Sequence, residues 1–191
     1  MGAALPTAYA PLIEKNPMEA VNSPKSSLDD EIFMKPKNIS VMLFARGLSI
    51  TWSEEPAYWY WFPLKETRNE EIDVALLLNV CWLEIHGKLN ISDLTPGITY
   101  EVFFIIMMNE PMYGWNTPVN LRIKLPDGSV QERKESLQEK PRGKWMELKV
   151  GEFRAQAAQE GEMDISLFEC EGGQWKRGLV VKGILFCPKK P

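Results

Sequence analysis

The sequence predicts an all-β protein, built as a sandwich or a barrel. Three observations predict it. Short segments in which apolar and polar residues alternate recur along the chain, which is the period-two pattern of strands with one buried face. Turn-forming residues separate these segments, as at Asp93–Gly97 and Pro126–Ser129. Only residues 151–160 have the pattern of a short helix. Many short strands without crossover helices favour this fold class.

The first half of the chain contains a series of short predicted strands. Residues 38–45 alternate in part, 49–52 form a short strand, and 58–61 alternate two types of aromatic ring. The segment 72–79 is continuously apolar and rich in leucine, so a strand and a short helix both remain possible there. Residues 81–89 alternate strictly, with Cys81, Leu83 and Ile85 on one face.

The second half continues the pattern. Residues 99–108 are apolar enough for a central strand. Residues 119–125 alternate and lead into a hairpin turn, and residues 109–116 read as a loop. The last predicted strands cover residues 144–150, 161–170 and 179–186.

The chain of 191 residues is predicted to contain one folded domain preceded by an extension. Residues 1–36 are rich in proline, lack tryptophan and show no sustained apolar period, which predicts a flexible N-terminal extension. The domain is expected over 37–191. No cationic or unbroken apolar leader opens the chain, and no apolar run is long enough for a membrane span. We therefore expect a cytoplasmic protein that is neither secreted nor bound to a membrane.

Composition and motifs argue against several functional classes. The net charge of −4 and the pI near 5.2 disfavour nucleic-acid binding. A single histidine excludes zinc sites that need two or three, so no metal site is predicted. Motifs for phosphate, dinucleotide and serine-hydrolase chemistry are missing from the sequence, so no cofactor, no catalytic residue and no enzyme activity are predicted. His86 is interpreted as a half-exposed or hydrogen-bonded surface residue.

The three cysteines, Cys81, Cys170 and Cys187, are too few for a disulfide scaffold. Cys170 and Cys187 end the last two predicted strands. If those strands pair antiparallel, the two residues lie at opposite ends and cannot form a bridge. Either three free thiols or an intermolecular disulfide is then expected.

Seven tryptophans are the unusual feature of the composition. Trp82 and Trp145 lie on alternating strands and are predicted to belong to the core. Three indoles and two phenols, by contrast, gather within residues 52–61. Such a cluster can cap the end of a sandwich. It can also bind sugars, because the apolar C–H face of a sugar ring fits an indole.

Five blocks of sequence carry a family resemblance. They are Ala45–Trp52, Tyr58–Trp61, Val80–Lys88, Gly143–Phe153 and Trp175–Gly183. In this order they resemble the phloem protein 2 family of plant lectins, over about residues 38–188. The resemblance implies a jelly-roll-like antiparallel β-sandwich with short helical segments. It implies a non-catalytic lectin, frequently a homodimer, that binds N-acetylglucosamine oligomers (chitin fragments) and N-glycan cores in a phloem or nucleocytoplasmic location, with a role in phloem defence or the wound response.

The same resemblance implies the carbohydrate-binding residues Trp52, Trp59, Glu162 and Glu169. The two glutamates are seven positions apart, so on one regular strand they face opposite sides. Both can join one site only if Glu162 lies in the preceding loop or a bulge intervenes. The expected site is a shallow, metal-independent groove near one end of the sandwich. The alternative function is a structural protein of sieve-element filaments, assembled through the cysteines and the N-terminal tail.

Overall fold

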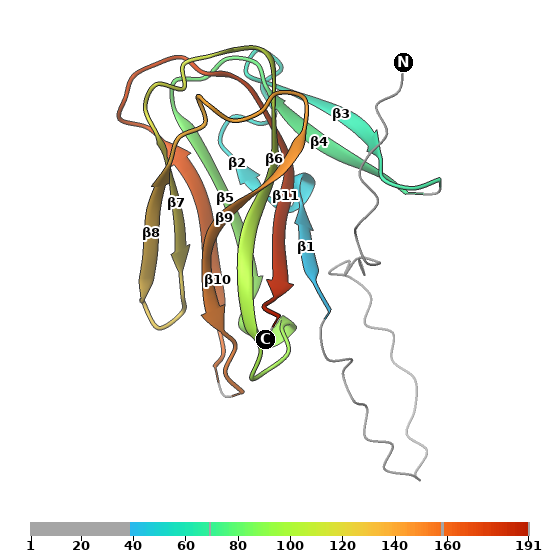
Figure 1. Ribbon diagram of the computed structural model, residues 1–191, viewed down its shortest axis with the longest axis vertical. Helices are drawn as coiled ribbons and strands as arrows, with labels where there is room; N and C mark the ends of the chain where they lie inside the picture. Colours follow the sequence, from blue (N-terminus) through green and yellow to red (C-terminus); the bar gives the residue numbers. More distant parts are fainter. Residues whose placement is uncertain (1–38, 69, 158, 191) are drawn as a thin grey trace.

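The computed structural model describes residues 39–68, 70–157 and 159–190 as two packed antiparallel β-sheets (Figure 1). One sheet contains β1 (Val41–Phe44), β3 (Trp59–Lys65), β4 (Glu71–Leu77), β6 (Thr99–Tyr113), β9 (Trp145–Arg154) and β11 (Arg177–Pro188). The other contains β2 (Ser49–Ile50), β5 (Leu83–Asn90), β7 (Val119–Lys124), β8 (Val130–Glu135) and β10 (Glu162–Glu169). This confirms the predicted β-sandwich. The predicted extension, residues 1–36, lies outside the described residues.

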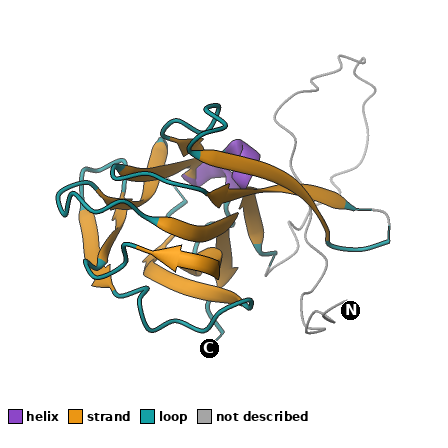
Figure 2. Ribbon diagram, turned by 90° about the horizontal axis from the view of Figure 1, so that it is seen from above, coloured by secondary structure: helices purple, strands orange, loops and turns teal. Residues whose placement is uncertain are grey.

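The six-stranded sheet is organised around β11. The order of pairing is β3-β4-β11-β6-β9, and β1 also pairs with β11. β6 follows one edge of β11 over its length, whereas β4 and β1 share the other edge. The register between β11 and β6 shifts between Val181 and Gly183, which lies between the segments that pair with β4 and with β1. Beyond its contact with β11, the β3–β4 hairpin extends away from the body of the sandwich (Figures 1 and 2).

The five-stranded sheet has the order β2-β5-β10-β7-β8. β10 lies at its centre and pairs along its whole length with β5. The alternation of β5 is realised as predicted, because Leu83 and Ile85 are fully buried while Glu84 and His86 face outward and are partly exposed. The outer face of β5, β10 and β7 is therefore a polar surface.

The sandwich interior holds apolar side chains from both sheets. Its largest fully buried side chain is that of Trp115, which has no exposed surface and donates from Nε1 to the Arg177 backbone oxygen at 2.8 Å. The sequence pattern predicts a loop over residues 109–116, but β6 continues to Tyr113, and Trp115 just beyond it lies in the core. Trp145 is half-buried, and the Lys182 ammonium lies 5.7 Å from its ring centroid.

The predicted short helix over residues 151–160 is wrong. Residues 151–154 continue strand β9, and the described residues from 155 to 160 contain no helix. The only helical turns in the described chain are the 3₁₀ turns η1 (Ala45–Gly47) and η2 (Ile91–Asp93). The ambiguous segment 72–79 is settled as a strand, β4, over Glu71–Leu77. No helix in the described part is long and apolar enough to cross a membrane.

Candidate functional site

Exposed aromatic rings gather at one end of the sandwich, which we call the aromatic end. It consists of the segments 51–58, 78–82, 114–118 and 170–176, which join strands at the top of the view in Figure 1. Three of the tryptophans in these segments are about half exposed: Trp52 at 49%, Trp82 at 46% and Trp175 at 50%. Large apolar side chains that stay in water cost hydrophobic stabilisation, so a group of them marks a surface that meets a partner.

Trp52 is held in an unusual backbone conformation. Its φ of +61° lies in the left-handed region, which side chains other than glycine rarely adopt. The turn is fixed by the Ser53 amide, which donates to the Ile50 oxygen at 3.1 Å. The Trp52 ring packs at 5.5 Å from the ring of Tyr58. The two rings form a tilted aromatic pair at the rim of the molecule.

Trp59 supports this turn from below. Its side chain is only 2% exposed and belongs to the core, and its Nε1 donates to the Thr51 backbone oxygen at 3.1 Å. Trp61 repeats the arrangement by donating to the Ser53 oxygen at 2.9 Å. Both indoles thereby anchor the segment that carries Trp52. The structure thus places Trp59 directly behind Trp52, but not on the surface.

Trp82 is positioned by a carboxylate. Its Nε1 donates to Glu84 Oε2 at 2.9 Å, and Glu84 also contacts the side chains of Thr51 and His86. The hydrogen bond from Trp82 and then that from His86 lower the pKa of Glu84, so the carboxylate stays ionised. The prediction that Trp82 lies in the core is wrong. The alternation of residues 81–89 indicates this exposure, because it places Trp82 on the same outward face as Glu84 and His86.

Glu169 lies beneath the aromatic end in a buried ion pair. It is 2% exposed and pairs with Lys176, which has no exposed surface. Glu169 Oε1 also accepts hydrogen bonds from the backbone of Glu171 at 3.0 Å and of Gly172 at 2.6 Å. Burial alone raises the pKa of Glu169, but Lys176 and the two backbone donors together lower it.

The ion pair ties the 170–176 segment to the neighbouring one. Lys176 Nζ donates to the Cys81 oxygen at 3.0 Å, and the backbones of Val80 and Lys176 pair as an isolated bridge. The flanking Trp82 and Trp175 therefore come from two segments locked to each other. The backbone of Gly114 packs closely against the same segment. A Cβ at this position would lie 1.9 Å from the Trp175 backbone oxygen, and the φ of Gly114 is +83°, so only glycine fits here.

Glu162 is not part of this end. It begins β10, opposite Asn90, whereas Glu169 ends the same strand opposite Leu83. Seven residues of extended strand separate them by about 23 Å. Glu162 faces outward and pairs with Lys88 at 2.9 Å, while Glu169 faces inward. Because the described β10 pairs without a bulge, the two carboxylates do not converge on one groove. Glu162 therefore does not share a site with the other three predicted residues, Trp52, Trp59 and Glu169.

Trp175 is the third exposed tryptophan of the aromatic end. The sequence alone assigns a binding role neither to Trp175 nor to Glu84. Among the described residues there is no group of three or more histidine, cysteine or carboxylate side chains placed to hold a metal ion. The aromatic end therefore offers flat apolar rings beside fixed polar groups.

Comparisons with known proteins identify the family. The profile of the family described as Phloem protein 2 matches residues 38–188. The chain is 46% identical over 172 residues to the Arabidopsis thaliana protein PHLOEM PROTEIN 2-LIKE A1, covering 83% of this chain and 70% of that one. It is 43% identical over 150 residues to a protein named Lectin from Luffa acutangula, covering 78% and 70% of the two chains.

A Lectin from Coccinia grandis is 32% identical over 138 residues, covering 72% of this chain and 87% of its own. Among solved structures, the CBM22-1 xylan-binding domain from Paenibacillus barcinonensis matches with a TM-score of 0.40 at 10% identity, covering 78% of this chain and 90% of that one. CBM6cm-2 from Cellvibrio mixtus lichenase 5A matches with a TM-score of 0.41 at 10% identity, covering 78% and 97%. On the extent of the family match and of the sequence identity, the chain belongs to the phloem protein 2 family.

Proposed function

We propose that the protein is a non-catalytic lectin and that its aromatic end binds N-acetylglucosamine oligomers and N-glycan cores. The observation that supports this most is the exposure of Trp52, Trp82 and Trp175 on adjoining segments. Two relatives named lectins, from Luffa acutangula and Coccinia grandis, support the carbohydrate class. Flat rings with apolar and polar sides are suited to sugar rings, which have the same division.

Each element of the aromatic end has a part in the proposed site. Trp52, with Tyr58 beside it, stacks on the apolar face of one sugar ring. Trp82 or Trp175 stacks on a further ring, and the free lone pairs of Glu84 accept hydrogen bonds from hydroxyl or acetamido groups. Trp59 and Glu169 act as supports, since both are buried and hold the segments that carry the exposed rings.

The site is preformed in this proposal. The Trp82 ring is oriented by its bond to Glu84, and the Trp52 turn is held by two indole donors from below. A strained left-handed residue that is over-determined in this way is typical of functional positions. Preformed shallow sites give weak binding to one sugar, of micromolar to millimolar order, and a gain of about tenfold for each added contact worth about 1.4 kcal/mol.

Titration calorimetry with N-acetylglucosamine, its dimer and its trimer tests the proposal. The trimer is expected to bind more tightly than the monomer, equally with and without a chelator. Trp52→Ala and Trp82→Ala are expected to weaken trimer binding at least tenfold. Tyr60→Ala is the matched control, because Tyr60 is 56% exposed but stacks on Phe62 in β3. Absence of heat with every oligomer, or equal losses in all three variants, would refute the assignment.

Assembly into a homodimer or into filaments is a second proposal. Cys81, Cys170 and Cys187 are free thiols and partly exposed. Burial raises the pKa of Cys170 to about 11, so this thiol is a poor nucleophile at neutral pH. Oxidative cross-linking would therefore use Cys81 or Cys187. Light scattering before and after oxidation, with Cys81→Ser and Cys187→Ser, tests it; a single unchanged monomeric mass under both conditions would exclude it. Two copies would also strengthen sugar binding through avidity.

A further inference from the structure

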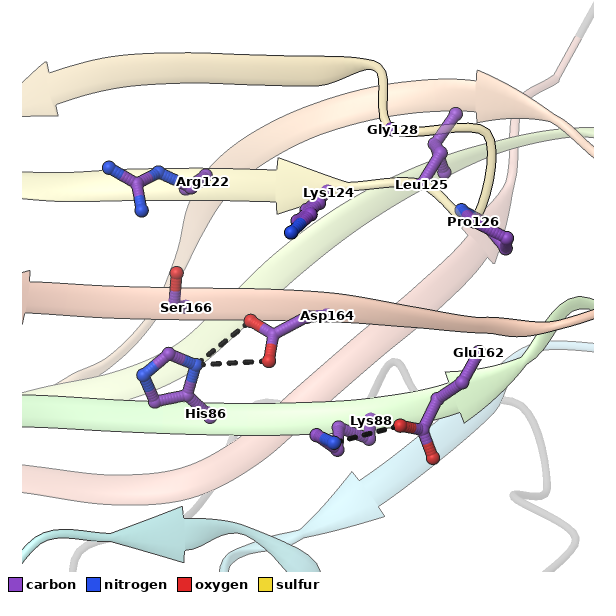
Figure 3. A pocket seen from close by; sticks show the side chains of 10 residues that line it. All are labelled: His86, Lys88, Arg122, Lys124, Leu125, Pro126, Gly128, Glu162, Asp164 and Ser166. Carbon is purple, nitrogen blue, oxygen red and sulfur yellow. Dashed lines mark hydrogen bonds and ion pairs between the residues drawn. The ribbon is translucent and has the colours of Figure 1, made fainter.

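A concave surface lies on the outer face of the five-stranded sheet, outside the segments of the aromatic end. It is a shallow depression of about 460 Å³ (Figure 3). Its volume falls within the range of small-molecule sites. The residues that line it are His86, Lys88, Arg122, Lys124, Leu125, Pro126, Gly128, Glu162, Asp164 and Ser166. We call it the sheet groove.

The register of the strands arranges these side chains in two rows. His86, Ser166 and Arg122 are directly opposite one another across β5, β10 and β7. Two residues further along, Lys88, Asp164 and Lys124 form the second row. Because alternate residues face the same side of a sheet, both rows point outward into the groove. Figure 3 shows Ser166 between Arg122 and His86.

Most charges in the groove are already compensated. His86 Nδ1 contacts Asp164 at 2.9 Å, Lys88 pairs with Glu162 at 2.9 Å, and Arg122 Nε pairs with Glu132 at 2.7 Å. In the described part of the chain no carboxylate pairs with Lys124, whose side chain is exposed. Lys124 is therefore the lining cation without an ion pair in the described chain, and its ammonium can pair with a negative charge on a ligand.

Ser166 supplies an independent sign of a ligand. It is 1% exposed, and its hydroxyl has no hydrogen-bond partner among the described residues. A buried hydroxyl without a partner costs about 1–3 kcal/mol. The guanidinium of the flanking Arg122, whose side chain is 40% exposed, lies 4.6 Å from the ring centroid of Phe168, and its two terminal nitrogens are free of described hydrogen bonds. If the guanidinium turns from this ring toward a ligand, it and the Ser166 hydroxyl can donate to the same ligand oxygen.

We propose that the sheet groove binds a sugar-sized polyol that carries one oxyanion group, either a phosphate or a carboxylate. Lys124, the outer nitrogens of Arg122 and the Ser166 hydroxyl donate to the oxyanion. The free lone pairs of Asp164 and Glu162 accept hydrogen bonds from the polyol. Pro126 and Leu125 form an apolar wall beside it. The size of the depression favours a polyol over a bare ion.

NMR titration of the full chain labelled with ¹⁵N tests the proposal with four probes: glucose 6-phosphate, glucuronate, glucose and inorganic phosphate. At least one of the first two is expected to shift amides of β5, β7 and β10 with saturable binding, and which one binds identifies the oxyanion. Glucose and inorganic phosphate are expected to bind at least tenfold more weakly. Equal binding of either to the charged sugar, or no shifts in β5, β7 and β10 with any probe, would overturn the proposal.

Variants locate the site. Ser166→Ala removes only a buried, unpartnered hydroxyl, so it is expected to raise the thermal midpoint of the free protein, or at least not to lower it, and to weaken binding at least fivefold. Lys124→Met is expected to weaken it at least tenfold and to reduce its salt dependence. Lys65→Met, an exposed lysine on β3 in the other sheet, is the matched control. Trp52→Ala is expected to leave this binding intact, which separates it from the lectin site. Unaltered binding in both Ser166→Ala and Lys124→Met would refute the assignment.

Discussion

The ion pair between Glu169 and Lys176 is expected to be a major contributor to the stability of the aromatic end. Glu169→Gln leaves the Lys176 ammonium, which has no exposed surface, without a counter-charge. Removing one partner of a buried pair costs about 3–5 kcal/mol. Domains of this kind have a free energy of unfolding of about 5–15 kcal/mol, so the substitution removes about a fifth of it or more.

The assay is chemical denaturation by urea, followed by tryptophan fluorescence at pH 7. A loss of about 3–5 kcal/mol corresponds to a fall in the thermal midpoint of roughly 6–20 °C for a domain of this size. Lys176→Met is expected to cost a similar amount. The double variant Glu169→Gln/Lys176→Met is expected to lose less than the sum of the two, because it leaves no unpaired charge.

The acid dependence gives a second readout. The folded-state pKa of Glu169 lies below its ordinary value of 4.5, so the unfolded chain takes up the proton first. The stabilisation is therefore complete above pH 4.5 and is lost as the pH falls through the lower, folded pKa. The difference in free energy of unfolding between the wild type and Glu169→Gln is expected to decrease as the pH falls from 4.5 through the folded-state pKa.

The exposed pair between Arg46 and Asp73 is the matched control, with side chains 49% and 40% exposed. Asp73→Asn is expected to cost less than about 1 kcal/mol. If Glu169→Gln also costs less than about 1 kcal/mol, the Lys176 charge is compensated in some other way, and the reasoning about the buried pair is refuted.

Three further outcomes are expected. Trp115→Ala should lower the free energy of unfolding by about 3–5 kcal/mol. Trp82→Ala should lower it far less, because the Trp82 ring is half exposed. The urea midpoints of the two variants measure this difference, and equal losses would contradict the burial pattern. Gly114→Ala should destabilise the protein, because the added Cβ meets the Trp175 oxygen; an unchanged thermal midpoint would argue against this contact. Desolvation is the largest single influence on His86 and lowers its pKa, but hydrogen bonds and charges from Asp164 and Glu84 together raise it. The stability that protonated His86 contributes is complete below pH 6.5 and is lost as the pH rises through the folded-state pKa. The difference in free energy of unfolding between the wild type and His86→Gln should therefore shrink toward alkaline pH. A difference that grows would contradict the upward direction of the pKa shift.

The sequence predicted the fold well where a strand has one wet face and one dry face. β5 is such a strand, and its alternation placed Leu83, Ile85 and His86 correctly. The local pattern failed to predict the burial of Trp115, which lies just beyond the end of β6 and donates to the backbone of Arg177, a residue distant in sequence. It also failed for residues 151–154, where the edge of β6 extends the strand beyond its local preference.

For the candidate site, residue type was a poor guide to burial. Two tryptophans seven positions apart, Trp52 and Trp59, have opposite surroundings, because one is on a left-handed turn and the other begins an inward-facing strand. The odd spacing of Glu162 and Glu169 did carry the correct geometric warning, since they point to opposite faces of β10. The buried Lys176 that neutralises Glu169 had no sequence signal, because only tertiary packing removes its solvent.

The position of β11 within its sheet has a consequence for biosynthesis. This strand lies between β6 on one side and β4 and β1 on the other, yet it is the last of the described strands to leave the ribosome. At about 5–20 residues per second, β1 waits on the order of ten seconds for its partner. During that interval β4 and β6 present unpaired backbone edges, a known route to aggregation. A nascent chain stalled before Arg177 is therefore expected to depend on chaperones until β11 is synthesised, inserts between its neighbours and closes the sheet.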